Sequence, residues 1–210
     1  MKKSQNRSIL ILAEHFAPAY KAGGIVRCLE NLVVLFESRY SFFVLTSNHN
    51  LDKKELLRDV PYDTWVQFAS NCKVFYTSNK KRRLSTIIET LQTIQPDVVY
   101  INGLYATFFT LVPLLFIKSM KQKPTVVLAP WGMLHNGSLS IKPLKKKLYL
   151  QLFKLAGIPK GIRWHATNEQ EKNDTHRWFS NSASVTIADA IPDSRDIPFV
   201  PIAKAKNAIR

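Results

Sequence analysis

The chain has 210 residues, of which 46% are hydrophobic and 21% charged, which provides for one substantial core and argues against global disorder. Thirty basic residues stand against 15 acidic ones, for a net charge of +15. This excess favours an anionic partner, such as nucleic acid, an acidic membrane or a phosphorylated small molecule, over a charge that serves solubility alone.

The N-terminus is first basic and then apolar, as signal peptides are. Its apolar run, residues 9–13, is shorter than a signal-peptide core, and Glu14 follows at once. We therefore predict a first strand at this position.

Seven apolar runs of strand length predict strands at residues 8–13, 41–46, 72–77, 98–101, 125–129, 162–166 and 183–188. Between them, apolar residues at helical spacing predict helices at 24–36, 84–94, 104–120, 143–155 and 169–179. The stretch 48–70 is polar and irregular, with a short helix expected near 53–59. The regular alternation predicts right-handed crossovers and an α/β fold. We expect a Rossmann-like, three-layer α/β/α domain with a mostly parallel sheet of about seven strands.

Residues 98–117 contain no charge, and a run of this length can cross a bilayer. Asn102, Gly103 and Pro113 interrupt it, and it divides into a strand and a helix. The sequence therefore favours a globular interpretation.

Two cysteines, Cys28 and Cys72, are too few for a disulfide framework and too far apart in sequence for a metal motif, so we expect buried thiols in a reducing cytosol.

The composition changes after Pro192, where prolines and charges replace helical periodicity. We predict one domain over residues 1–192 and a linker over 193–210.

In open parallel sheets, ligands bind beyond the carboxyl ends of the strands. The first such loop ends in Gly23 and Gly24 at the predicted helix start. Free N–H groups there can hold a phosphate, whereas the alternative is that glycine only allows close packing of strand and helix. Neither the G-x-G-x-x-G fingerprint nor a P-loop is present.

Two further loops follow predicted strands. Asn102 and Gly103 are either site residues or a favoured turn pair. The loop 129–139 contains Trp131, Gly132 and His135 and is longer than a connection requires, although a structural tryptophan and a solvent-exposed histidine explain it equally well.

Two other residues that could do chemistry have simpler interpretations. Asn168 and Glu171 have the spacing of a capping box at a helix start, and we prefer that role for Glu171. His165 alternates within a buried strand pattern and is expected to be a hydrogen-bonded core residue.

Basic clusters lie at residues 80–83 and 145–147, and each by itself indicates a solvated face. Lys145, Lys146 and Lys147, with neighbouring apolar residues, could instead contact an anionic bilayer. The apolar residues concerned are Leu148, Tyr149, Leu152 and Phe153. Nucleic acid is the competing partner, but no recognised nucleic-acid motif is present, and we expect none to bind.

Five segments occur in the order seen in one enzyme family: HFAPAYKAGGIVRCLENL, PDVVYING, APWGMLHNGSLSIKPLKKKLY, HATNEQE and IADAIP. Over residues 9–192 the chain resembles the N-terminal, acceptor-side domain of retaining glycosyltransferases of family 4, which is one half of a GT-B fold. The resemblance implies a nucleotide-sugar donor, transfer with retention, and no cofactor or obligatory metal. It also implies work on surface glycans such as lipopolysaccharide, with a glycan or lipid-linked acceptor, in the cytoplasm or at the inner face of the plasma membrane.

The resemblance also assigns roles to residues. Asn102 and His135 become candidate catalytic residues, and six others are expected to bind substrate or donor phosphates: Lys21, Gly23, Gly24, Gly103, Trp131 and Gly132. The chain departs from the family at Asn102, where histidine is frequent, at Trp131, where arginine is common, and at Asp189, where asparagine is frequent.

The family's C-terminal domain, which binds most of the donor and supplies paired glutamates, would begin where this sequence ends. We therefore expect the 210-residue chain to be inactive alone. The alternative is a non-catalytic basic module that binds an anionic membrane, nucleic acid or a partner chain.

Overall fold

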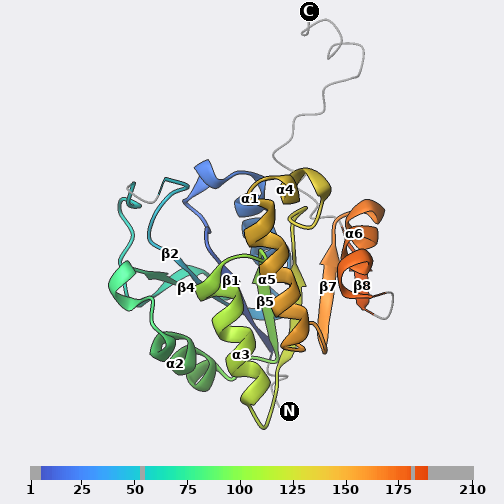
Figure 1. Cartoon of the computed structure of the whole chain (residues 1–210). Coiled ribbons are helices and arrows are strands. Elements are labelled where there is room, and N and C mark those ends of the chain that lie inside the picture. Colours follow the sequence, from blue (N-terminus) through green and yellow to red (C-terminus); the bar gives the residue numbers. More distant parts are fainter. Residues whose placement is uncertain (1–5, 53–54, 181–182, 189–210) are drawn as a thin grey trace, which may run out of the picture.

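The first strand, β1 (Arg7–Ala13), ends in four buried residues, as expected for a central strand covered on both faces. The computed structural model describes residues 6–52, 55–180 and 183–188. In these residues β1 lies in the middle of one eight-stranded sheet, in the order β3-β4-β2-β1-β5-β6-β7-β8 (Figure 1). The predicted α/β class with a mostly parallel sheet is confirmed.

Seven of the strands are parallel to their neighbours. After β1 these are β2 (Tyr40–Ser47), β4 (Cys72–Thr77), β5 (Val98–Asn102), β6 (Thr125–Ala129), β7 (Ile162–Ala166) and β8 (Ser184–Ile187). Each coincides with a predicted strand to within one residue at either end. The predicted linker 193–210 and Asp189 lie outside the described residues.

The eighth strand, β3 (Trp65–Ala69), was not expected. It pairs antiparallel with β4 through a two-residue connection, and Trp65 packs edge-to-face against Phe75 and Phe43. The expected short helix near 53–59 is wrong for the described part of that stretch. Residues 55–59 contain bends and a single bridge from Leu56 to His49.

Helices cover both faces of the sheet. The side chains of α1 (Gly24–Leu35) pack on one face. Four helices pack on the other: α2 (Leu84–Ile94), α3 (Val112–Ser119), α5 (Pro143–Leu155) and α6 (Glu169–Phe179). Four shorter elements complete the described chain: 3₁₀ turns at Tyr20–Ala22 and Asn79–Lys81, a π-helical turn at Thr107–Leu111, and helix α4 (Asn136–Ser140).

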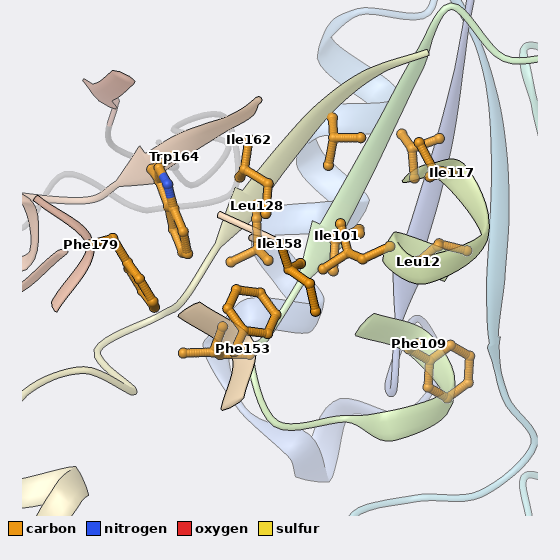
Figure 2. Close-up of a cluster of buried hydrophobic side chains, with 14 of the residues drawn as sticks. Leu12, Ile101, Phe109, Ile117, Leu128, Phe153, Ile158, Ile162, Trp164 and Phe179 are labelled. Atoms are coloured by element: carbon orange, nitrogen blue, oxygen red, sulfur yellow. The ribbon is translucent and has the colours of Figure 1, made fainter. Parts of the chain in front are cut away.

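Alternation along β1 separates two cores. Leu10 and Leu12 belong to the core beneath the four helices, whereas Ile11 and Ala13 belong to the core beneath α1. Figure 2 shows the larger core, in which the rings of Trp164 and Phe179 lie near each other. Their centroids are 4.6 Å apart and the rings are stacked, which joins α6 to β7.

The predicted helix 104–120 is shorter than expected. It begins with a π-helical turn, Thr107–Leu111, that leads directly into α3. The Thr110 hydroxyl donates to the carbonyl of Gly103 at 2.9 Å, which fixes the turn against the end of β5. None of the helices in the described part of the chain is both long and apolar enough to cross a membrane.

Neither cysteine forms a disulfide within the described residues. Cys72 is buried as predicted, and burial raises its pKa to about 12, whereas Cys28 is only half-buried.

Candidate functional site

A cavity of about 230 Å³ opens where the carboxyl ends of β1 and β5 lie side by side. The chain builds the sheet outward from β1 through β2, then returns and builds the other half from β5. The crevice at such a reversal is the place where open α/β sheets bind ligands. The topology therefore makes this cavity the candidate functional site.

Four segments line the cavity. They are the end of β1 with the residues after it, the start of α1, the loop after β5, and the loop after β6. The lining residues are Ala13, Glu14, His15, Ala22, Ile25, Val26, Asn102, Gly103, Tyr105, Ala106, Trp131 and Met133. Three of the residues assigned from the sequence, Asn102, Gly103 and Trp131, are therefore brought together.

The Asn102 side chain is held by two hydrogen bonds. Its Oδ1 accepts from Nε1 of Trp131 at 3.1 Å, and its Nδ2 donates to the carbonyl of Tyr100 at 3.3 Å. Asn102 is 7% exposed, so the two bonds satisfy an otherwise costly buried amide. The back wall of the cavity is a fixed pair of side chains.

Two residues after β5 and β6 adopt left-handed backbone. Gly103 has φ +94°, and a Cβ there would meet the Met133 Cε at 3.3 Å. Trp131 has φ +51°, an unusual value for a bulky side chain. This conformation of Trp131 accompanies the indole bond to Asn102.

Glu171 fixes the loop after β6. Its Oε1 accepts from the amide of Gly132 at 2.6 Å, and its Oε2 accepts from the amide and hydroxyl of Thr167 at 2.8 and 2.9 Å. Asn168 caps α6 through the amide of Glu171 at 2.9 Å, as the sequence predicts. The Glu171 carboxylate does not complete the capping box at the Asn168 amide, because it accepts from Thr167 and Gly132 and so joins two loops.

His165 is a hydrogen-bonded residue, as expected. Its Nδ1 bonds to the Tyr100 hydroxyl at 2.7 Å, and its Nε2 bonds to the carbonyl of Ala188 at 2.6 Å. A carbonyl can only accept, so Nε2 carries a proton and donates it to Ala188. The ring also meets the Trp131 indole edge-to-face at 5.9 Å, behind the cavity wall.

The two adjacent glycines, Gly23 and Gly24, lie outside the lining of the cavity. Gly23 has φ +94° and ψ −163°, a conformation that is essentially restricted to glycine. A Cβ on either Gly23 or Gly24 would meet no atom of the described chain within 4 Å. Close packing of helix on strand therefore does not explain Gly24. The neighbouring Lys21 pairs with Glu55 at 2.6 Å on the surface.

His135 also lies outside the cavity lining. It is the exposed N-cap residue of α4, and its Nδ1 accepts from the amide of Gly137 at 3.2 Å. Of the eight residues assigned from the sequence, Lys21, Gly23, Gly24, Gly132 and His135 do not line the cavity.

Sequence reasoning missed Glu14, His15, Tyr105 and Met133. For the first two a signal existed, because they are the residues that directly follow β1 at the carboxyl edge of the sheet. Tyr105 falls within the expected helix 104–120, and Met133 is an apolar residue in a loop, so neither had a clear signal in the sequence. Burial raises the pKa of Tyr105 to about 12, so its hydroxyl is a neutral hydrogen-bonding group.

A histidine pair lies at the β1 end of the cavity, where His15 belongs to the lining. The rings of His15 and His49 meet edge-to-face at 5.5 Å, and Nε2 of His49 accepts from Nη2 of Arg82 at 2.8 Å. Burial lowers the pKa of His15, with Glu14 opposing this shift. Arg82 is half-buried, so the expectation of a solvated face is wrong for this member of the cluster 80–83. No group of three His, Cys, Asp or Glu side chains that could hold a metal is found among the described residues.

Comparison with solved structures shows that the fold of this chain is similar to that of known proteins. No family model matches the chain, and no curated protein matches it. Sucrose-phosphate synthase from Thermosynechococcus elongatus matches with a TM-score of 0.62 at 12% identity over 97% of this chain. The match covers 52% of the synthase, so the chain spans about half the length of that enzyme. At this identity the likeness shows the fold alone.

A dTDP-glucose 4,6-dehydratase from Bacillus anthracis is also similar, with a TM-score of 0.44 at 12% identity over 76% of this chain and 54% of the dehydratase. This weaker similarity adds nothing to the fold assignment.

Proposed function

We propose that the chain is the acceptor-side half of a retaining glycosyltransferase that moves a sugar from a nucleotide-sugar donor to a glycan or lipid-linked acceptor. The supporting observation is the cavity between β1 and β5, in a fold that sucrose-phosphate synthase shares over 97% of this chain. The setting proposed from the sequence resemblance is surface polysaccharide synthesis such as that of lipopolysaccharide, in the cytoplasm.

The chemistry of the cavity suits a sugar. Trp131 and Tyr105 offer aromatic surface to the apolar side of a pyranose, and Glu14, His15 and Asn102 offer polar groups for its hydroxyls. Its volume of about 230 Å³ is below the roughly 300–1,000 Å³ of sites that enclose a whole ligand. A site of this size fits one wall of a cleft whose other wall belongs to a donor-binding domain.

The residues assigned from the sequence fall into two groups in this proposal. Gly23 and Gly24 have no side chains, so they leave the N-terminus of α1 open to a ligand. The free amides and the helix dipole there favour a phosphate. Lys21 attracts that phosphate when its ion pair with Glu55 opens. Asn102 and His135 are the proposed catalytic residues, with His135 acting on parts of the substrate that extend beyond the cavity. We propose that no metal takes part.

A two-part experiment tests the proposal. Saturation-transfer NMR with free monosaccharides and disaccharides measures binding to the 210-residue chain, and nucleotide release from UDP- and GDP-sugars measures turnover. We expect weak sugar binding that Trp131→Ala abolishes, and no turnover. Absence of sugar binding, or binding that survives Trp131→Ala, would overturn the cavity assignment, and robust turnover by this chain would overturn its assignment as half of an enzyme.

The matched control is Trp178→Ala. Trp178 is half-buried in α6 and does not line the cavity. Its removal should leave sugar binding unchanged, which separates an effect at the cavity from a general loss of folding.

A further inference from the structure

One side of α5 is apolar and faces solvent. Four leucines repeat along it at helical spacing, and Ile141 lies just before the helix. Their exposed fractions are 64% for Ile141, 84% for Leu144, 56% for Leu148, 57% for Leu152 and 83% for Leu155. Exposed leucines are ordinary when they are scattered, but a contiguous row along one helix indicates an interaction surface. We call these five residues the leucine face.

The opposite side of α5 packs on the protein. Phe153 is buried, and Tyr149 donates to the carbonyl of Leu104 at 2.8 Å. Lys146 donates to the carbonyl of Ser138 at 2.5 Å. The bilayer-contacting set suggested by the sequence is therefore wrong for Tyr149, Phe153 and Lys146, and the leucine face replaces it.

The stretch of chain that carries the leucine face has charges of one sign. Residues 98–168 contain ten Lys and Arg residues and no Asp or Glu. Four of these lysines are exposed on or next to α5: Lys142, Lys145, Lys147 and Lys154. An apolar row bordered by lysines is the pattern of helices that lie in the interface of an anionic bilayer.

We propose that the leucine face docks onto a lipid bilayer that contains acidic headgroups. The helix would lie along the surface, with the leucines entering the acyl boundary and the lysines meeting lipid phosphates. A second copy of the chain fits less well, because a two-fold contact through this face would oppose lysines to lysines. Nucleic acid would pair with the lysines but leave the leucines exposed to water.

The docked orientation bears on the cavity. Nζ of Lys146 lies 5.2 Å from the centroid of the Tyr105 ring, and Tyr105 lines the cavity. Together with the bond from Tyr149 to Leu104, this contact fixes α5 against the loop after β5. When the protein is docked on the bilayer through the leucine face, its cavity would therefore lie near the lipid surface. The proposal does not depend on sugar transfer, since membrane binding is measured without any substrate.

Vesicle flotation tests the proposal. The probes are vesicles of phosphatidylcholine alone and of phosphatidylcholine mixed with phosphatidylglycerol. We expect binding to the mixed vesicles only, weakened by salt. The double variant Leu148→Ser/Leu152→Ser should lower the partition coefficient by about tenfold or more, because the apolar anchor is lost. Lys145→Gln/Lys147→Gln should lower it on mixed vesicles and reduce the dependence on salt.

The control replaces an exposed leucine elsewhere. Leu84, at the start of α2, is 56% exposed, like Leu148, and Leu84→Ser should bind vesicles as the parent chain does. Circular dichroism establishes that each variant is folded. The proposal is overturned by no binding to either vesicle, by equal binding to both, or by parent-like binding of Leu148→Ser/Leu152→Ser. A dimer in solution that this variant dissociates would overturn it in favour of a second copy. Sugar binding by the 210-residue chain is read separately, so either proposal can fail without the other.

Discussion

Oε1 of Glu171 lies 2.6 Å from the amide nitrogen of Gly132, which joins the start of α6 to the loop after β6. Glu171 is 4% exposed and its carboxylate also receives the amide and hydroxyl of Thr167. The tryptophan at the back of the cavity directly precedes Gly132 in the chain. A buried carboxylate in the neighbouring loop therefore holds the cavity wall in place.

Replacing Glu171 should destabilise the fold. Glu171→Ala leaves the amides of Gly132 and Thr167 without their acceptor, and we expect a loss of about 3 kcal/mol in the free energy of unfolding. Glu171→Gln keeps one acceptor oxygen and should lose less. Urea denaturation followed by tryptophan fluorescence measures both. The control is Glu169→Ala, an exposed residue in the same helical turn, for which we expect a change within about 0.5 kcal/mol. Equal stability of Glu171→Ala and Glu169→Ala would contradict the structural role.

Gly23 and Gly24 should respond differently to replacement by alanine. Gly23→Ala should cost about 1–3 kcal/mol in the free energy of unfolding, because φ +94° with ψ −163° strains any side chain. Gly24→Ala should cost nothing, since its Cβ meets no atom of the described chain and alanine favours a helix. Thermal unfolding compares the two variants. A marked loss in Gly24→Ala would show a packing constraint there after all.

The hydrogen bond between Trp131 and Asn102 should appear in a double-mutant cycle. Trp131→Phe removes the indole donor, and Asn102→Ala removes the acceptor. We expect a coupling energy of about 0.5–1.5 kcal/mol from urea unfolding of the two single variants and the double variant. Additive losses would show that the 3.1 Å contact contributes nothing.

His15 should make the protein less stable at acidic pH. Burial lowers its pKa in the folded state below the ordinary value of 6.5, although Glu14 and a hydrogen bond with the His49 backbone act in the opposite direction. The unfolded chain therefore takes up a proton at His15 before the folded chain does, and stability falls as pH drops below 6.5. His15→Gln should lose less stability than the parent chain between about pH 7.5 and about pH 5.5. His135→Asn, which removes an exposed imidazole and keeps a cap, should behave as the parent does.

Periodicity was sufficient to predict most of the elements. Helices α2, α5 and α6 and strands β4, β6 and β7 have the predicted bounds, because each lies between clear turn residues and buries one consistent face. Strand β3 was missed because Gln67 and the polar residues around it obscure a short alternation. Its antiparallel pairing depends on the hairpin into β4, a tertiary feature that a window of sequence does not contain.

The site was predictable by topology more than by residue type. The carboxyl ends of β1 and β5 had to meet in a parallel sheet of this order, and Asn102, Gly103 and Trp131 follow from that. His135 was chosen for its chemistry, but the unexpected helix α4 uses its ring as a cap and places it outside the cavity lining. The contact of Glu171 with Gly132 joins residues 39 positions apart, and no local pattern predicts it.

The absence of carboxylates from residues 98–168 also has a long-range effect. These residues form β5 to β7 and the helices α3 and α5 over them, whereas β1 to β4 and α1 belong to the part of the chain that contains Glu14, Glu30 and Glu37. Charge divided in this way gives the molecule an electric dipole. At low ionic strength such a dipole turns the molecule while it still diffuses, so that its cationic half leads toward any negatively charged surface before contact is made.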